Sequence, residues 1–203
     1  MAATTKQIAR AAAALVAVLS APAFAADAGA YVFGSAGLTN YSSFDPDITG
    51  ADSKKTGSYG IKGGGGYLFN LGNFMLGGEG GYVDLGKAKF TFAGQETTAK
   101  AIAGYVAAIG VLPFNDQFSM HLKLGLASGS SKVSTPAGSS SGTSVKPMYG
   151  IGGQFEINRN FGIRAEFEAY EAGKKGDAND PNDFNTLAKI NMLSAGMVYK
   201  FGN

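Results

Sequence analysis

Residues 118–126 read Phe-Ser-Met-His-Leu-Lys-Leu-Gly-Leu, and apolar side chains occupy every second position of this stretch. In an extended strand successive side chains point to opposite faces, so this period of two places all five apolar side chains on one face. The other face carries Ser119, His121 and Lys123. Helical spacing would mix apolar and polar side chains on each face, so the stretch predicts a β-strand with one apolar and one polar face.

The same alternation recurs along the chain. In residues 161–169 five apolar residues alternate with Gly162, Arg164, Glu166 and Glu168. Two further segments are apolar on both faces and are assigned as strands from their length and their flanking turns. The eight predicted strands are residues 30–39, 57–69, 74–85, 100–112, 118–126, 149–157, 161–169 and 191–201.

The connections between these segments alternate in length. Three are tight and turn-like, at residues 71–73, 114–116 and 158–160. Four are long and polar, at residues 40–56, 86–99, 128–144 and 171–188. Short turns at one end and long loops at the other are typical of an outer-membrane barrel with short periplasmic turns and longer outside loops. The sequence therefore predicts an all-β fold, an eight-stranded antiparallel up-and-down transmembrane β-barrel with both chain ends on the periplasmic side.

The two faces of these strands predict which way the wall of the barrel is oriented. A face of Phe, Leu, Ile and Tyr suits lipid, whereas the ionic face suits an enclosed interior in which opposite charges pair. Two interpretations of the interior remain open, a salt-bridged plug and a polar constriction that passes small solutes. Aromatic pairs near strand ends, at 31 and 33, 67 and 69, and 199 and 201, predict the interfacial girdle. The predicted interior polar network is Lys62, Glu79, His121, Lys123, Gln154, Arg164, Glu166 and Glu168.

The first 25 residues have the layout of a secretory signal peptide. Lys6 and Arg10 precede an apolar run at residues 11–19, and Ala23-x-Ala25 is a small-x-small cleavage signal. A run this short is about half of what a membrane-spanning helix requires. We expect cleavage after residue 25, which leaves an outer-membrane barrel domain at 26–203 that carries equal numbers of acidic and basic residues.

Composition excludes several classes of protein. The chain has no cysteine, which rules out a disulfide framework and a cysteine-ligated metal site. It has 17 basic and 15 acidic residues and no basic stripe, which argues against nucleic-acid binding. The sequence matches no established motif for a metal site, a cofactor or a catalytic centre. None of the stretches beyond residue 25 is apolar enough for a transmembrane helix.

Other motifs have a structural interpretation beside a functional one. Ser119 and His121 could form a hydrolase pair, but no acidic partner is identifiable and both share a face with Lys123. The run Gly63–Gly66 is interpreted as relief of crowding between strands, because no phosphate-loop Lys follows it. The Ser- and Gly-rich third loop, residues 128–144, is expected to be mobile. Acidic residues of the first and fourth loops could bind divalent cations weakly, and they are Asp45, Asp47, Asp52, Asp177, Asp180 and Asp183.

Residues 194–201 resemble the C-terminal β-signal that the barrel assembly machinery reads in outer-membrane proteins. The matching positions are Ser194, Gly196, Tyr199 and Phe201, although the chain continues for two residues past the last aromatic. The resemblance implies the assembly machinery as a partner.

The whole predicted mature chain is similar to the OmpA-like outer-membrane β-barrel superfamily, the small eight-stranded porin-like and surface-antigen proteins. The resemblance implies a cell outer membrane location in a Gram-negative cell, lipid and lipopolysaccharide as surroundings, and a structural or surface-interaction role through four extracellular loops. An extracellular or host-surface ligand of the loops and a narrow solute channel are both compatible with it. The peptidoglycan-binding domain of some members is not expected here. The stretches that carry the resemblance are residues 31–37, 78–86, 148–155 and 164–170.

Overall fold

The computed structural model describes residues 28–44, 53–55, 57–92, 95–135, 138–172 and 188–201. Most of these residues lie in eight long strands and one short strand, β2. The strands form a single antiparallel sheet that closes on itself through the pairing of β4 with β5. The predicted all-β, eight-stranded barrel is confirmed. The strands are β1 (Gly29–Phe44), β2 (Ser53–Lys55), β3 (Gly57–Asn70), β4 (Met75–Phe92), β5 (Gln95–Pro113), β6 (Phe118–Thr135), β7 (Gly138–Glu156), β8 (Phe161–Ala172) and β9 (Ala188–Phe201).

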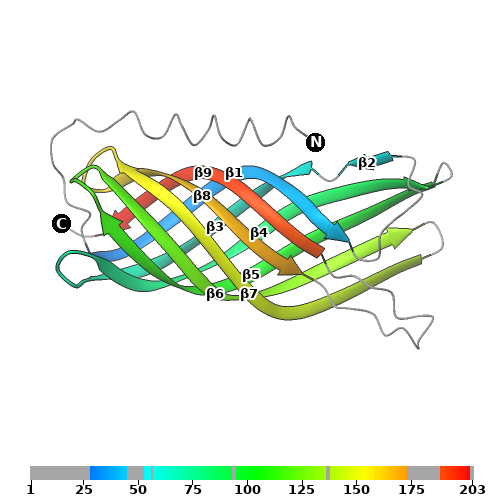
Figure 1. Cartoon of the computed structure of the whole chain (residues 1–203), viewed down its shortest axis with the longest axis horizontal. Coiled ribbons are helices and arrows are strands. Elements are labelled where there is room, and N and C mark those ends of the chain that lie inside the picture. The colour runs from blue at the N-terminus through cyan, green and yellow to red at the C-terminus, as the bar shows by residue number, and fades with distance from the viewer. Residues whose placement is uncertain are drawn as a thin grey trace.

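Each long strand pairs with its neighbours in the chain, and β1 pairs with β9 to complete the ring. The strands are tilted against the long axis of the barrel, as closure of a sheet requires (Figure 1). The described part of the chain contains no helix that is both long and apolar enough to cross a membrane. The predicted signal peptide, residues 1–25, lies outside the described residues.

The three predicted tight turns are confirmed at one end of the barrel, which we call the turn side. Asn side chains stabilise them, since Asn70, Asn115 and Asn158 each accept hydrogen bonds from backbone N–H groups two or three residues ahead. These short links fix the register of the strand pairs that they join.

At the opposite end, the loop side, two of the predicted loops are wrong. Residues 86–99 and 128–144 were expected to be loops, but β4 pairs with β5 as far as Phe92 and Gln95, and β6 pairs with β7 as far as Thr135 and Gly138. These two extended hairpins project from the barrel in Figure 1. Backbone pairing continues there although the sequence is polar, and the Thr and Val residues of these segments favour strands.

The period-two alternation determines which side chains enter the barrel. The Phe, Leu, Ile and Tyr positions predicted to face outward on β3, β6 and β9 are exposed, as at Ile61, Leu122, Leu124 and Met197. Most of the residues between them are buried, as at Lys62, Lys123 and Val198. The predicted orientation, with an apolar outer wall and an ionic interior, is confirmed for these strands.

The run of glycines in β3 provides room for rings from β1. A Cβ at Gly64 would lie 2.2 Å from the Gly80 carbonyl oxygen and 2.8 Å from Phe33, and a Cβ at Gly66 would lie 2.6 Å from the Tyr31 hydroxyl. Relief of crowding, the expected role of residues 63–66, is confirmed at these two positions.

Candidate functional site in the barrel interior

All eight predicted interior residues are buried, with relative exposures of 6% or less. They come from five strands: β3, β4, β6, β7 and β8. Since every strand directs alternate side chains inward, residues far apart in sequence meet around the barrel axis. The structure brings these eight side chains into one connected cluster.

Glu79 on β4 is one centre of this cluster. Its carboxylate accepts hydrogen bonds from the hydroxyls of Tyr31 and Tyr105, each at 2.8 Å. It also pairs with Lys123 Nζ at 2.6 Å and with Arg164 Nη1 at 2.7 Å. Both oxygens are thus fully used, which offsets the large desolvation penalty of a buried carboxylate.

Glu166 and Glu168 on β8 form the second centre. Glu166 contacts Lys62, Lys123 and His121 Nε2, the last at 2.8 Å, and Arg164 lies 3.8 Å away. Glu168 accepts from the same two lysines, from Lys123 Nζ at 3.1 Å. Lysines that bridge two or three carboxylates connect β3, β6 and β8 across the interior.

A third group extends the network toward the turn side. Arg164 Nε donates to Gln154 Oε1 at 2.8 Å, and Gln154 Nε2 donates to Glu156 at 2.6 Å. Lys200 Nζ completes the chain with a 2.6 Å contact to Glu156. Glu156 and Lys200 were not among the predicted members of the network, although the alternation of their strands directs both side chains inward.

Among the described residues, the buried charges balance. Lys62, Lys123, Arg164 and Lys200 face four glutamates at positions 79, 156, 166 and 168. A buried ion pair is stable only when geometry and additional hydrogen bonds compensate for lost hydration, and removal of one partner costs about 3–5 kcal/mol. The cluster therefore acts as a unit in which each member is needed to neutralise the others.

Glycines on β7 make room for this cluster. A Cβ at Gly152 would lie 2.6 Å from the His121 ring, and a Cβ at Gly150 would lie 2.8 Å from Glu168 Cγ. Both glycines lie on the inward face of β7, opposite Glu166 and Glu168 of β8. The Gly-x-Gly pattern that contributed to the sequence resemblance thus has a packing role.

Apolar side chains fill the interior on both sides of the ionic cluster. Toward the turns lie Leu68, Met75, Val111 and Val198, all 6% exposed or less. Toward the loops the interior holds a second buried group, which the sequence analysis did not predict. Its larger members are Leu85, Met148, Tyr170, Ile190 and Met192. The described interior therefore has apolar groups toward both ends, and the Glu156–Lys200 ion pair interrupts the group on the turn side.

The prediction that Tyr31 and Phe33 belong to an interfacial girdle is wrong. Their side chains are 3% and 6% exposed and point inward. Phe33 lies beneath the ammonium groups of Lys62 and Lys123, each 5.6 Å from its ring centroid, a cation–π arrangement. The alternation of apolar and polar residues could not show which face of β1 points inward, because Val32 and its outward neighbours are apolar like Tyr31 and Phe33.

The other two aromatic pairs do lie on the outer wall near the turns. Tyr67 and Phe69 are exposed, with ring centroids 4.7 Å apart. Tyr199 contacts both Phe161 and Phe201 at centroid distances of 5.0 Å. These rings are placed where an aromatic girdle is expected at a membrane interface.

The structure describes the candidate catalytic residues but not the candidate metal ligands of the loops. Ser119 and His121 are both buried inside the barrel, and His121 Nε2 contacts Glu166. The acidic residues at 45, 47, 52, 177, 180 and 183 lie outside the described residues. Within the described ranges no group of three or more His, Asp or Glu side chains is arranged to hold a metal ion.

The four residues of the predicted assembly signal lie on β9, which closes the barrel against β1. Tyr199 and Phe201 face outward, whereas Ser194 is buried. A Cβ at Gly196 would lie 2.1 Å from the Gly34 carbonyl oxygen, so glycine is required where the first and last strands meet.

A closed barrel with an apolar outer wall, an aromatic band and an ionic interior is the architecture of an integral outer-membrane protein of Gram-negative cells. The chain belongs to the outer membrane protein beta-barrel domain family, whose profile matches residues 11–201.

Solved structures show the same fold. The chain is similar to Ail, the attachment invasion locus protein of Yersinia pestis, with 21% identity and a TM-score of 0.53 over 86% of this chain and 99% of that one. It is also similar to Neisserial surface protein A, with 18% identity and a TM-score of 0.53 over 85% of this chain and 97% of that one. No curated protein sequence matches the chain.

Replacement of Arg164 by Ala is expected to destabilise the barrel by about 3–5 kcal/mol, because it removes one of the two cations that neutralise Glu79 and leaves the buried cluster with an excess negative charge. Unfolding in urea, followed by heat-modifiable gel mobility, measures the change. The matched control is Lys189→Ala, which removes a largely exposed partner of Glu171 and should change stability by about 1 kcal/mol or less. Equal stability of the two variants would contradict the role assigned to the interior network.

Proposed function

We propose that this protein is a non-enzymatic, structural outer-membrane barrel whose loop-side extensions contact extracellular partners. The filled interior is the observation that carries the proposal. An ionic cluster and buried apolar side chains toward both ends of the barrel occupy the space in which a channel would hold water. A rigid, packed stem suits a scaffold that displays surface elements.

The displayed elements are the two extended hairpins. Beyond Leu126 the outward positions of β6 become Ser128, Ser130 and Lys132, and the ribbon stays paired as far as Thr135 and Gly138. A paired ribbon holds its side chains in fixed positions, which lowers the entropy lost on binding. The structure of Ail contains a heparin analogue. An anionic glycan is accordingly the first ligand class to test on these hairpins.

We further propose that residues 1–25 direct export and that Ser194, Gly196, Tyr199 and Phe201 are read by the barrel assembly machinery. The two aromatics lie on the outer wall of β9, the strand that closes the barrel against β1, and this placement supports the proposal. With short turns in the periplasm, the extended hairpins face the cell exterior.

The alternative function, a narrow channel for small solutes, makes a contrary prediction. Purified protein in planar bilayers is expected to show no steady conductance steps, because the packed interior leaves no continuous hydrated path. If the ionic cluster and the buried apolar side chains together seal the barrel, Arg164→Ala should produce small, discrete conductance steps. Reproducible steps from the unaltered protein would refute the sealed stem and support the channel.

Removal of residues 129–144, with Ser128 and Val145 joined by Asn-Gly, is expected to abolish ligand binding while the barrel stays folded. Ser128 and Val145 are already direct partners in the ladder, and Asn-Gly suits a two-residue hairpin. Binding to immobilised heparin is the measurement, and heat-modifiable mobility is the control for folding. Undiminished heparin binding by the shortened protein, or no binding by the intact one, would contradict the role of this hairpin.

A further inference from the structure

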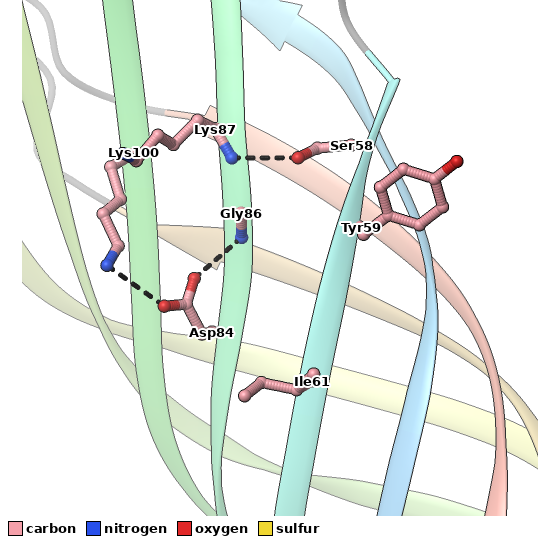
Figure 2. A pocket seen from close by; sticks show the side chains of 7 residues that line it. All are labelled: Ser58, Tyr59, Ile61, Asp84, Gly86, Lys87 and Lys100. Atoms are coloured by element: carbon pink, nitrogen blue, oxygen red, sulfur yellow. Dashed lines mark hydrogen bonds and ion pairs between the residues drawn. The ribbon is translucent and has the colours of Figure 1, made fainter.

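A pocket of about 370 Å³ opens on the outer wall of the barrel at the loop side, between β3, β4 and β5. Figure 2 shows Lys100 on β5 directed at Asp84 on β4, with Ile61 of β3 beside them. The Lys100 Nζ to Asp84 Oδ2 distance is 3.1 Å. Lys87 and Tyr59 also line the pocket. None of these side chains takes part in the interior network.

A β-bulge builds this pocket. Asp84 is paired with Ile102 and Lys87 with Lys100, so two residues of β4 oppose one residue of β5. Gly86 lies in the bulge with φ of 76°, and its N–H donates to Asp84 Oδ1 at 2.9 Å. A Cβ at Gly86 would lie 2.3 Å from the Tyr59 carbonyl oxygen, so only glycine fits.

The bulge also reverses the facing of Lys87. Val83 and Leu85 point into the barrel, and unbroken alternation would direct Lys87 inward as well. With the extra residue, Ala88 is buried and Lys87 is exposed on the outer wall. The backbone N–H of Lys87 is held by Ser58 Oγ at 3.0 Å.

Three exposed lysines consequently form one row across neighbouring strands. Lys87 lies directly opposite Lys100, and Lys100 lies directly opposite Lys132 on β6. Adjacent strands are about 4.8 Å apart, and like charges directly opposite each other are destabilising. Asp84 contacts one member of the row. The remaining positive charge favours an anion between Lys87 and Lys100.

The pocket lies at the edge of the apolar belt. Its floor includes Tyr59 and Ile61, which are 81% and 66% exposed on the outer wall. Ile102 is the outward residue next to Lys100 on β5 and Tyr82 the one next to Asp84 on β4. Apolar side chains thus lie immediately below the lysines, as at a boundary between hydrocarbon and headgroups.

We propose that this pocket binds the phosphorylated headgroup of an outer-leaflet glycolipid. The phosphate lies between Lys87 and Lys100, and an acyl chain lies along Ile61 and the outer wall below. The inference rests on the proposed orientation of the hairpins toward the cell exterior. Charge complementarity selects the phosphate, and the exposed apolar floor selects a lipid over a soluble anion.

The test uses the folded full-length protein in neutral-detergent micelles and native mass spectrometry. Bisphosphorylated lipid A is expected to bind, and the double variant Lys87→Gln/Lys100→Gln should weaken that binding by about tenfold or more. Lys189→Gln, which removes an exposed lysine on the loop side of β9, is the matched control and should leave binding unchanged.

Two comparisons decide the ligand. Dephosphorylated lipid A should bind the unaltered protein as weakly as lipid A binds the double variant, and inorganic phosphate at the same concentration should not displace lipid A. Equal binding of the two lipids, displacement by inorganic phosphate, or an unchanged double variant would each overturn the proposal. Heparin binding by the double variant, measured in parallel, tests the function of the β6–β7 hairpin separately, because residues 129–144 are intact in that variant.

Discussion

The structure depends on keeping charge out of hydrocarbon while every backbone group is hydrogen-bonded. A closed sheet satisfies the backbone, and the alternation of its strands then forces half of the side chains into a narrow enclosure. Four buried cations and four buried carboxylates share that enclosure. Each carboxylate is neutralised by partners from other strands, so the ionic cluster connects segments that the turns alone would not hold in place.

The same constraint explains where glycine is used. Inward glycines on β7 leave space for His121 and Glu168, and those on β3 leave space for Tyr31 and Phe33. Gly86 has a different role, because it allows the bulge that turns Lys87 outward. Glycines therefore influence both the packing of the barrel interior and the charged groups on the outer wall.

Alternation was sufficient to predict the fold and most of the interior, because residues such as Lys123 and Arg164 are flanked by apolar neighbours of opposite facing. It failed on β1, where both faces are apolar, and so misplaced Tyr31 and Phe33. The polar composition of residues 128–135 predicted a loop, although these residues form a paired strand. The bulge at Gly86 could not be foreseen from alternation, since one extra residue reverses all facing beyond it.

The central claim is that the Leu and Phe rows contact lipid while the ionic side chains are enclosed. The chain contains no tryptophan, so a single Leu124→Trp replacement supplies a clean fluorescent reporter on the outer wall. In bilayers of lipids brominated on the acyl chains, the account predicts strongly quenched, blue-shifted emission. Unquenched emission from a protein that stays in solution without detergent would contradict it.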